Sequence, residues 1–376
     1  MPRLSAAPRR VHLLSAANPV GPDLARFGFD GLVAYLAFIR AHLPDGLRLT
    51  ASRAVLAAVQ DVERGGRRGD ARRIPDPQTA LDDPDTLAIV ASNGGAYFSR
   101  ILPHVDFSAL ARRRAPLTVF GFSELTGLVN VVASYPAGRG VYWLCPNYLA
   151  WTIRPAARAR AAFGEFWRRL PEFIAQAGGP LPASSRVAIS HREATLPSGP
   201  APLRGAASVR EAGWPGATTL EFDGCVRGRL AAGRVRSGPV RLVGGCISVL
   251  VALLTGPLAR RIRPERRWLA IEDVREVAYR LDRHLASLKH AGWFERLAGL
   301  LIGDFHTSDQ PDQSAALLEL LRFHAPRRLP IVVTRSFGHV WPMTPLALNR
   351  RLWLEARGGE VEIAPLRRSR RQAGAR

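Results

Sequence analysis

The sequence predicts an α/β protein built on parallel strands, and three observations carry that prediction. Short apolar runs typical of buried strands alternate with segments whose apolar residues recur at helical spacing. Hydrophobic residues make up 47% of the chain and charged residues 22%, which permits a buried core and excludes a fully disordered or fibrous chain. The length of 376 residues indicates two domains or one large α/β unit.

The first 150 residues contain three predicted strands. These are residues 11–17, 87–91 and 117–122, which end respectively at a loop containing Pro19 and Gly21, at Asn93-Gly94-Gly95 and at Ser123. Apolar spacing predicts helices over residues 27–42 and immediately after Ser123. The polar, Arg- and Gly-rich residues 61–79 are predicted to form a loop, and residues 1–10 a disordered basic tail.

The middle of the chain lacks a regular pattern. Residues 151–177 are predicted to be helical, whereas residues 178–238 are rich in Gly, Pro, Ala and Ser. A long irregular stretch inside a folded protein is usually functional or mobile. Residues 151–238 are therefore interpreted as a linker and irregular insertion between an N-terminal unit, 11–150, and a C-terminal unit, 239–366.

The C-terminal unit repeats the alternation of strands and helices. Strands are predicted at residues 268–272, 298–302 and 329–334. One helix face is predicted from residues spaced three or four apart: Val274, Val277, Leu281, Leu285 and Leu288. Residues 367–376 are predicted to form a second disordered basic tail.

The charge balance has two interpretations. The 53 basic residues exceed the 31 acidic residues and give a net charge of +22, and Lys289 is the only lysine. A strongly basic chain favours polyanionic partners. Arginine used almost to the exclusion of lysine, together with abundant Ala, Gly and Pro, favours instead a compositional bias with solvated arginines.

Cysteine and histidine spacing gives no sign of a metal site. Cys145, Cys225 and Cys246 are widely spaced without a CxxC pair, so neither structural zinc nor a disulfide scaffold is predicted. His284 and His290 lie six apart, which does not place them on one helix face. The longest apolar run is far shorter than the roughly 20 residues that a membrane-spanning helix needs. We expect a cytoplasmic protein with no membrane association, no metal and no cofactor.

Three polar residues stand out because each follows a predicted strand. Ser123 follows Gly121 at a strand-to-helix turn, but G-x-S alone also describes an ordinary helix N-cap. Glu272 ends the strand WLAIE, where an acid can simply favour the start of a helix. His339 lies in the loop after LPIVVTRSF, where a histidine is often only solvated.

Their shared position favours a catalytic interpretation over the three separate ones. Open α/β sheets bind ligands at the carboxyl ends of their strands. A serine needs a base, a histidine titrates near neutrality, and a carboxylate fixes the tautomer of that histidine. Gly94 and Gly95, also beyond a strand end, could bring a backbone N–H close to a reacting oxygen.

Five blocks of sequence, in order, resemble one known family over most of residues 11–355. The blocks are GGAYFSRILPHVDF, LTVFGFSELTGLVN, VRLVGGCISVLVALLTGP, LAIEDVREVAYRLDRHLASLKHAGWFERLAGLLIGDF and LPIVVTRSFGHVWPMTPLALNRRL. They are similar to the serine peptidase family of LD-carboxypeptidases and microcin C self-immunity hydrolases. The resemblance implies a two-domain α/β fold, usually homodimeric, with the active site in the cleft between the domains.

The resemblance also implies roles for individual residues. The nucleophile of the family corresponds to Ser123, the carboxylate to Glu272 and the histidine to His339. The oxyanion hole corresponds to the backbone N–H groups of Gly95 and Glu124. Residues expected to contact substrate are Asn93, Gly94, Tyr97, Trp214 and Cys246.

Three departures from the family pattern fall near the substrate. The common Arg-Gly-Gly-Tyr-Gly is replaced by Asn93-Gly94-Gly95-Ala96-Tyr97, so the arginine is missing and the tyrosine is displaced by one position. The common Gly-Gly-Asn ends in Cys246, and Glu124 stands where aspartate is commoner. In the terms of the resemblance, these changes touch the substrate pocket and leave Ser123, Glu272 and His339 in place.

The sequence leaves several functions open. The first is a cofactor-independent serine hydrolase that cleaves an amide bond in a small peptide-like substrate, either a muropeptide in cell-wall recycling or an aminoacyl- or peptidyl-nucleotide. Trp214, on the irregular insertion, could stack on a nucleobase or could simply pack against its own domain. The other possibilities are an inactive family member and a nucleic-acid-binding protein. No recognised nucleic-acid-binding motif occurs, so nucleic acid is not an expected partner.

Overall fold

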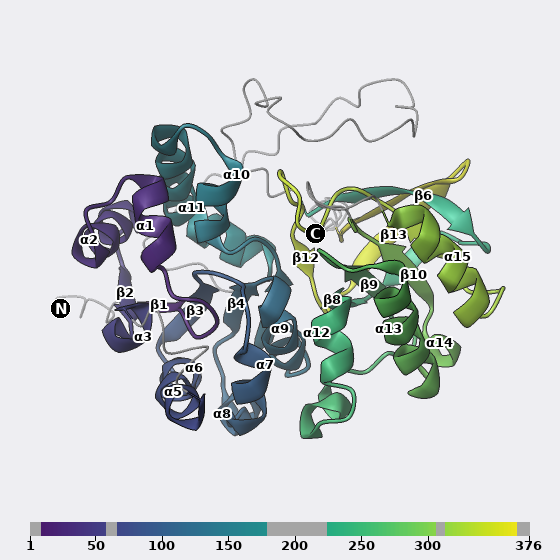
Figure 1. Ribbon diagram of the computed structural model, residues 1–376, viewed down its shortest axis with the longest axis horizontal. Coiled ribbons are helices and arrows are strands. Elements are labelled where there is room, and N and C mark those ends of the chain that lie inside the picture. The colour runs from purple at the N-terminus through teal and green to yellow at the C-terminus, as the bar shows by residue number, and fades with distance from the viewer. Residues whose placement is uncertain (1–8, 58–65, 179–223, 306–312, 367–376) are drawn as a thin grey trace, which may run out of the picture.

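Two β-sheets, one built mainly from each half of the chain, form the framework of the protein (Figure 1). The computed structural model describes residues 9–57, 66–178, 224–305 and 313–366. The two halves lie side by side, with helix α9 (Thr126–Ala133) of the first half next to strand β8 (Leu242–Cys246) of the second. The α/β class predicted from the sequence is confirmed.

The first sheet has six strands in the order β12-β5-β4-β3-β1-β2. Five of them are parallel: β1 (Arg9–Leu14), β2 (Leu47–Ala51), β3 (Thr86–Ala91), β4 (Leu117–Gly121) and β5 (Gly138–Tyr142). Every residue of β3 and β4 is buried, which explains why threonine is the only polar residue type in either strand. Because these strands are parallel, their carboxyl ends meet at one edge of the sheet.

Helices cover both faces of this sheet and connect its strands. Their bounds are α1 (Gly21–Phe27), α2 (Leu32–His42), α3 (Arg53–Ala57), α5 (Gly66–Arg73), α6 (Pro75–Asp82), α7 (Phe98–Ile101), α8 (Ser108–Arg112), α9, α10 (Leu149–Thr152) and α11 (Ala156–Gln176). Short 3₁₀ turns lie at η1 (Leu102–His104), η2 (Ser123–Leu125) and η3 (Pro146–Tyr148). The long helix α11 buries an aromatic-rich face that includes Phe163, Phe166 and Trp167.

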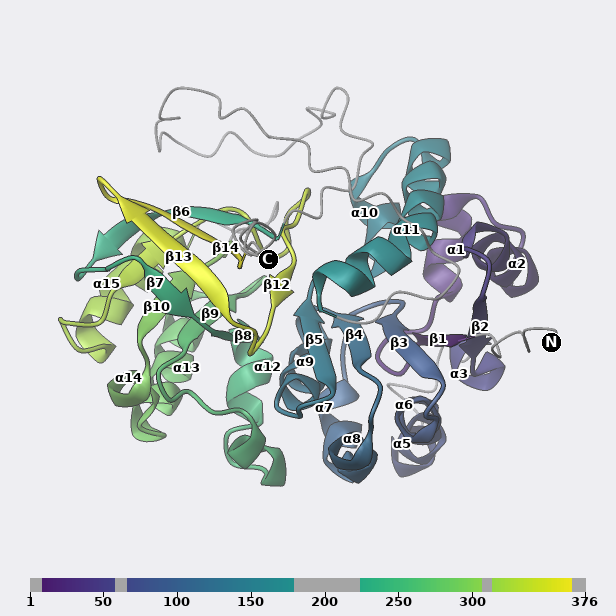
Figure 2. The ribbon, with the colours of Figure 1, turned by 180° about the vertical axis from the view of Figure 1, so that it is seen from behind.

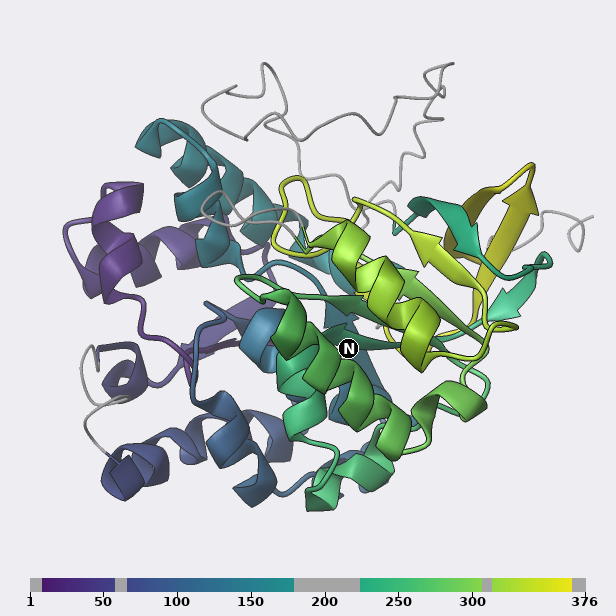
Figure 3. The same ribbon diagram turned by 45° about the vertical axis from the view of Figure 1, so that its right-hand side comes forward.

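The second sheet has eight strands in the order β7-β13-β14-β6-β11-β10-β9-β8. The four strands β8, β9 (Trp268–Glu272), β10 (Gly299–Ile302) and β11 (Ile331–Val333) are parallel. The remaining strands are antiparallel: β6 (Val226–Ala232), β7 (Gly238–Val240), β13 (Leu352–Arg357) and β14 (Glu360–Pro365). Helices α12 (Ile247–Ala252), α13 (Ala278–His290), α14 (Trp293–Arg296) and α15 (Ser314–His324) belong to this half, and α13 and α15 lie side by side in front of the sheet (Figure 3).

A segment from the C-terminal half returns to the first sheet. Strand β12 (Leu346–Ala347) pairs antiparallel with β5, and Figure 2 shows it between the two halves. Nearby, the indole Nε1 of Trp143 donates a hydrogen bond to the carbonyl of Met343 at 2.7 Å. The two sheets are therefore joined by backbone pairing as well as by side-chain packing.

The structure differs from the sequence prediction in several elements. The prediction of a loop over 61–79 is wrong for the described residues from 66 onward, because α5 and α6 occupy that part of the range. Arg9 and Arg10 belong to β1 rather than to a tail, while residues 1–8 lie outside the described residues. Strand β6 lies within the segment expected to be irregular, and pairs with β14 and β11.

Two predicted helices have different bounds. The helix expected over 27–42 starts only at Leu32, because Gly28 ends the preceding helix α1 in the left-handed conformation at φ 74° and Gly31 precedes α2. Val274 and Val277 precede α13, which starts at Ala278, so only the last three residues of the predicted face are helical. Apolar spacing cannot distinguish a helix from the half-buried segment that leads into it.

Candidate active site

Ser123 stands at the sharp turn between β4 and α9. Its φ is 59°, in the left-handed region that residues other than glycine rarely adopt. Its N–H donates to the Tyr142 hydroxyl at 3.1 Å, and its carbonyl accepts a hydrogen bond from Thr126 Oγ1 at 2.6 Å. Both neighbouring peptide groups are thus held, while the serine side chain remains partly exposed.

Glycines bring the end of β3 against this serine. A Cβ added to Gly94 would lie 2.9 Å from Ser123 Cβ and 3.4 Å from Ser123 Oγ, so no larger residue fits there without a shift. Gly95 has φ 119°, and a Cβ there would overlap the side chain of Asn18. The exposed backbone of Gly95 thus directly follows the glycine that contacts Ser123.

His339 and Glu272 form a buried pair. Nδ1 of His339 lies 2.7 Å from Oε2 of Glu272, whose side chain is 0% exposed. The imidazole ring packs on Phe122, the residue before Ser123, with ring centroids 4.5 Å apart. The carbonyl of His339 accepts a hydrogen bond from the Tyr148 hydroxyl at 3.1 Å. The ring is thus oriented on one side by a carboxylate and on its face by the residue adjoining Ser123.

Tyr142, at the carboxyl end of β5, links the three residues. Its hydroxyl donates to Oε1 of Glu272 and accepts from the N–H of Ser123. A continuous path of hydrogen bonds therefore runs from His339 through Glu272 and Tyr142 to the backbone of Ser123. Sequence reasoning missed Tyr142, because no strand was predicted to end there and its partner Glu272 lies 130 positions away.

The electrostatic surroundings favour the charged form of His339. Burial is the largest single influence and lowers the pKa of His339. The charge and hydrogen bond of Glu272, with smaller contributions from Asp273 and Asp304, outweigh burial and raise the pKa above its ordinary value of 6.5. Burial, followed by the charge of Glu272, raises the pKa of Tyr142 well above its usual range, so this phenol stays protonated and donates.

The ordinary alternatives for these three residues do not fit the geometry. Ser123 is not a helix N-cap, because η2 begins at Ser123 itself and the residue before α9 is Leu125. Glu272 does not open a helix, because α13 starts only at Ala278. The side chain of His339 is only 13% exposed and is not a solvated loop histidine.

The other predicted site residues occupy different surroundings. The buried carboxylate of Glu124 accepts hydrogen bonds from the N–H and hydroxyl of Ser99, at 2.8 and 2.6 Å, and so ties α7 to the serine turn. The side-chain amide of Asn93 donates to Asp23 at 2.5 Å. The ring of Tyr97 lies under the guanidinium of Arg100.

Cys246 is buried at the carboxyl end of β8. Its N–H donates to Thr126 Oγ1 at 3.0 Å, and its thiol contacts the Ser248 hydroxyl at 3.3 Å. Burial, and then the charges of Asp273 and Glu272, raise the pKa of this thiol well above its usual value. The cysteine is therefore a neutral thiol beside the site rather than a second nucleophile.

Trp214 and residues 1–8 and 367–376 lie outside the described residues. Among the described residues, no group of three or more His, Cys, Asp and Glu side chains is arranged to hold a metal ion. Every described helix is too short or too polar to cross a membrane.

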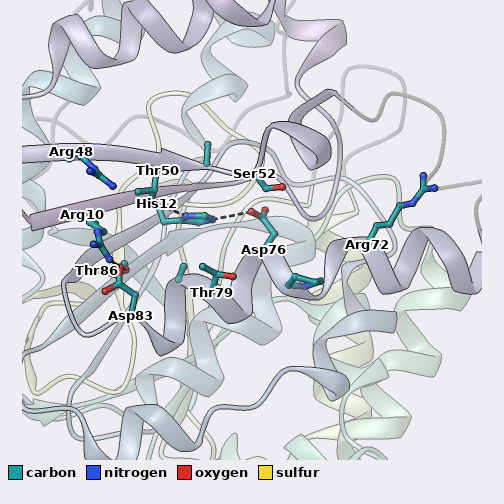
Figure 4. Close-up of a pocket in the computed structure, with 13 residues that line it drawn as sticks. Arg10, His12, Arg48, Thr50, Ser52, Arg72, Asp76, Thr79, Asp83 and Thr86 are labelled. Carbon is teal, nitrogen blue, oxygen red and sulfur yellow. Dashed lines mark hydrogen bonds and ion pairs between the residues drawn. The ribbon is translucent and has the colours of Figure 1, made fainter.

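A pocket of about 440 Å³ lies apart from these residues, beside β1, β2 and α6 (Figure 4). Within it His12 contacts Thr50 through Nδ1 and Asp76 through Nε2, both at 3.1 Å, and Asp76 also accepts a hydrogen bond from the N–H of Ser15. The contacts of His12 and Asp76 therefore hold the carboxyl end of β1 against α6.

Comparisons with known proteins agree with this architecture. The profile of the LD-carboxypeptidase N-terminal domain matches residues 11–138, and that of the LD-carboxypeptidase C-terminal domain matches residues 240–354. A Streptomyces coelicolor protein named as a carboxypeptidase is 28% identical over 276 residues, 72% of this chain and 69% of its own. A Bacillus subtilis protein named as a murein peptide carboxypeptidase is 42% identical over 65 residues, 17% of this chain and 20% of its own.

Solved structures share the fold over nearly the whole chain. The microcin C7 self-immunity protein MccF superposes with a TM-score of 0.62 at 16% identity, covering 96% of this chain and 97% of MccF. A muramoyltetrapeptide carboxypeptidase from Oxalobacter formigenes gives 0.58 at 17% identity, covering 94% and 97%. An MccF-like protein from Streptococcus pneumoniae, solved with AMP, gives 0.62 at 16% identity, covering 95% and 99%.

Both halves of the chain match domains of one family, in order, and two sheets of the expected kind carry them. The protein is therefore a member of the LD-carboxypeptidase and MccF-like family and a serine carboxypeptidase-type hydrolase.

Proposed function

We propose that this hydrolase cleaves an amide bond in a small peptide-like substrate through Ser123, His339 and Glu272. The observation that carries the proposal is the hydrogen-bond path from His339 through Glu272 and Tyr142 to the N–H of Ser123. It connects a nucleophile, a base and an orienting carboxylate that come from three separate strand ends.

The proposed reaction begins with attack of Ser123 Oγ on the substrate carbonyl. His339 accepts the serine proton at Nε2, because Nδ1 faces Glu272 and keeps its proton there. The same proton then goes to the leaving amine, and an acyl-enzyme remains on Ser123. Water, deprotonated by His339, releases the acid and restores the serine.

The negative oxygen of the tetrahedral intermediates needs donors that are fixed beforehand. We propose the backbone N–H groups of Gly95 and Glu124 for this role. The N–H of Ser123 is bonded to Tyr142 and is therefore not the donor. The tie from Glu124 to Ser99 and the contact between Gly94 and Ser123 support a rigid turn at this place.

Replacing Ser123 with alanine tests the nucleophile. Ser123→Ala removes only the hydroxyl from a partly exposed turn, so the fold should persist, while kcat should fall by roughly 10³ or more. Circular dichroism and the melting temperature check the fold, and hydrolysis of a reporter amide measures the rate. Near wild-type turnover in this variant would contradict the assignment.

For the substrate we propose an amide attached to a nucleotide or another bulky group. MccF has been solved with aspartyl sulfamoyl adenosine and with glutamyl sulfamoyl guanosine, and the Streptococcus pneumoniae protein with AMP. A muropeptide tetrapeptide is the second candidate, favoured by the names of the Bacillus subtilis relative and the Oxalobacter formigenes structure.

Mass spectrometry distinguishes the two candidates. The purified protein is incubated separately with a muropeptide tetrapeptide and with a peptidyl-sulfamoyl adenosine, with Ser123→Ala as the blank. Cleavage of the nucleoside amide supports the proposal. If the protein releases D-alanine from the tetrapeptide and does not cleave the nucleoside amide, the substrate is instead a muropeptide of cell-wall recycling.

A further inference from the structure

A pocket of about 300 Å³ opens at the junction of the two halves, at the far ends of α9 and β8 from Ser123. Its N-terminal wall is the last turn of α9, with Asn130 and Ser134. Its C-terminal wall is the start of β8 and the segment that follows η4 (Pro257–Arg261), with Asn349 between the walls. A molecule bound here would touch both halves of the chain at once.

The pocket is lined by four arginines and no acid. Arg260, Arg261 and Arg263 are exposed, and Arg267 is half-buried just before β9. The remaining polar lining comes from Asn130, Ser134 and Asn349, which carry no charge. The charge of the pocket is therefore entirely positive.

Contacts within the protein do not neutralise these arginines. Across the part of the chain that the structure describes, none of the four forms an ion pair with a carboxylate. Arg267 Nε donates to the Asn349 side chain at 2.9 Å, and Arg261 lies over the ring of Tyr135. Glu265, the nearest acid in sequence, pairs instead with Arg296 at 2.9 Å.

Further arginines increase the repulsion. The pKa of Arg267 is lowered by burial and then by the charges of Arg241 and Arg263, although Glu265 partly opposes this. The pKa of Arg350 is lowered by burial and then by Arg241. Guanidinium groups held together without counter-charges lose stability that a multivalent anion would restore.

We propose that this pocket binds a small ligand that carries two or more phosphate groups. Guanidinium groups match phosphate oxygens in two-point hydrogen bonds, and the neutral amides of Asn130 and Asn349 add no repulsion. A volume of about 300 Å³ suits a small molecule rather than the long groove that a nucleic acid requires. The ligand chemistry is shared by inorganic pyrophosphate and nucleoside diphosphates.

Calorimetric titration of the full chain tests the proposal. Pyrophosphate, ADP and orthophosphate are compared at a constant ionic strength of about 0.15 M, so that simple screening is the same in each arm. The test variant is Arg260→Gln/Arg263→Gln, which removes two exposed charges and only one weak backbone contact of 3.4 Å. The matched control is Arg322→Gln, an exposed arginine on α15.

We expect the wild-type protein and Arg322→Gln to bind pyrophosphate more tightly than orthophosphate, and the double variant to bind it about tenfold more weakly or worse. Tighter binding of ADP than of pyrophosphate would identify the ligand as a nucleotide and uphold the proposal. A second variant, Ser134→Glu, places an acid on the opposite wall of the pocket and should weaken pyrophosphate binding as much as the double variant does. It keeps the proposal testable if Arg260→Gln/Arg263→Gln folds poorly.

Three results would overturn the proposal. These are no pyrophosphate binding by the wild-type protein, equal binding by wild type and both variants, or variant-sensitive binding of single-stranded RNA without any binding of pyrophosphate. The last result would assign the arginines to a nucleic-acid surface. Because the pocket lies apart from Ser123, none of these outcomes depends on the proposed hydrolysis.

Discussion

Tyr142 connects the carboxylate of Glu272 to the backbone of Ser123, although these residues come from three strand ends in two sheets. A buried phenol with a raised pKa is a permanent donor toward a carboxylate. The same hydroxyl oxygen accepts the N–H of Ser123. We therefore expect Tyr142 to position both the orienting carboxylate and the serine turn.

Tyr142→Phe should lower kcat by about tenfold to a hundredfold with a small change in KM, because one hydrogen bond to a buried carboxylate is lost. Steady-state kinetics on a reporter amide measure kcat and KM separately. Tyr135→Phe, also a buried tyrosine but outside the hydrogen-bond path, is the control and should behave as wild type. A change confined to KM would assign Tyr142 to substrate contact instead.

The raised pKa of His339 sets the acid limb of activity. A histidine accepts a proton only when it is neutral, so activity should rise as the pH rises through the pKa of His339. Because that pKa is raised, the rise in activity should be centred above pH 6.5, the ordinary value for histidine. Glu272→Gln removes the largest influence that raises this pKa and leaves burial, which lowers it. The acid limb of Glu272→Gln should therefore move to lower pH, while kcat falls by roughly 10³.

The pH dependence of kcat/KM, measured for the wild-type protein and for Glu272→Gln, checks the direction of this shift. An acid limb that stays at the same pH in Glu272→Gln would mean that Glu272 does not control the histidine. A matched control is Glu276→Gln, an acid near the start of α13 that pairs with Arg280 and His284. That variant should keep the wild-type limb.

At the scale of single elements, the strands that carry the site were the predictable part. The strands that end before Asn93, before Ser123 and at Glu272 are mostly apolar, because both faces of a parallel sheet are covered. The hydroxyl of Tyr142 could not be predicted, since its partner Glu272 is 130 positions away and the tyrosine reads as one more buried strand residue. The helices α5 and α6 were missed because their sequences are polar and contain Gly and Pro.

The glycines of β8 matter because the strand passes close to Tyr142. Gly245 has φ 138°, and a Cβ there would lie 2.7 Å from Tyr142 Cε2 and 2.8 Å from Thr126 Oγ1. A Cβ on the neighbouring Gly244 would lie only 2.0 Å from the carbonyl oxygen of Ala270. The two glycines thus allow β8 to pack against both the next strand and the tyrosine that joins the site residues.

Gly245→Ala should cost about 2 kcal/mol or more of unfolding free energy and should also reduce activity, because the added methyl is strained and displaces Tyr142. Chemical denaturation measures the free energy. Gly256→Ala is the control, since a Cβ there meets only the Leu253 carbonyl at 3.6 Å, and should change stability by less than about 1 kcal/mol. Equal costs for the two variants would contradict the packing argument.

At the scale of the whole molecule, the site depends on how the two sheets are joined. Strand β8 is the edge of the second sheet, and an edge strand exposes unpaired backbone groups. Asn130 on α9 covers that edge: its side chain donates to the Gly244 carbonyl at 2.7 Å and accepts from the Gly244 N–H at 3.0 Å. An N-terminal helix therefore completes the hydrogen bonding of a C-terminal strand that ends at Cys246.

Asn130→Leu keeps the number and branching of the side-chain heavy atoms but leaves the N–H and carbonyl of Gly244 unpaired in a buried place. We expect a loss of about 2 to 5 kcal/mol, the usual cost of two buried backbone groups without partners. Because the lost bonds hold the two halves together, calorimetry should also show the single unfolding transition separating into two.

Thr118→Val is the matched control: Thr118 Oγ1 is buried without a partner among the described residues, so replacing it should leave stability equal or higher. If Asn130→Leu were as stable as Thr118→Val and still unfolded in one step, the halves would be held by the pairing of β12 with β5 and by apolar packing, and the asparagine would serve only to cover the strand edge.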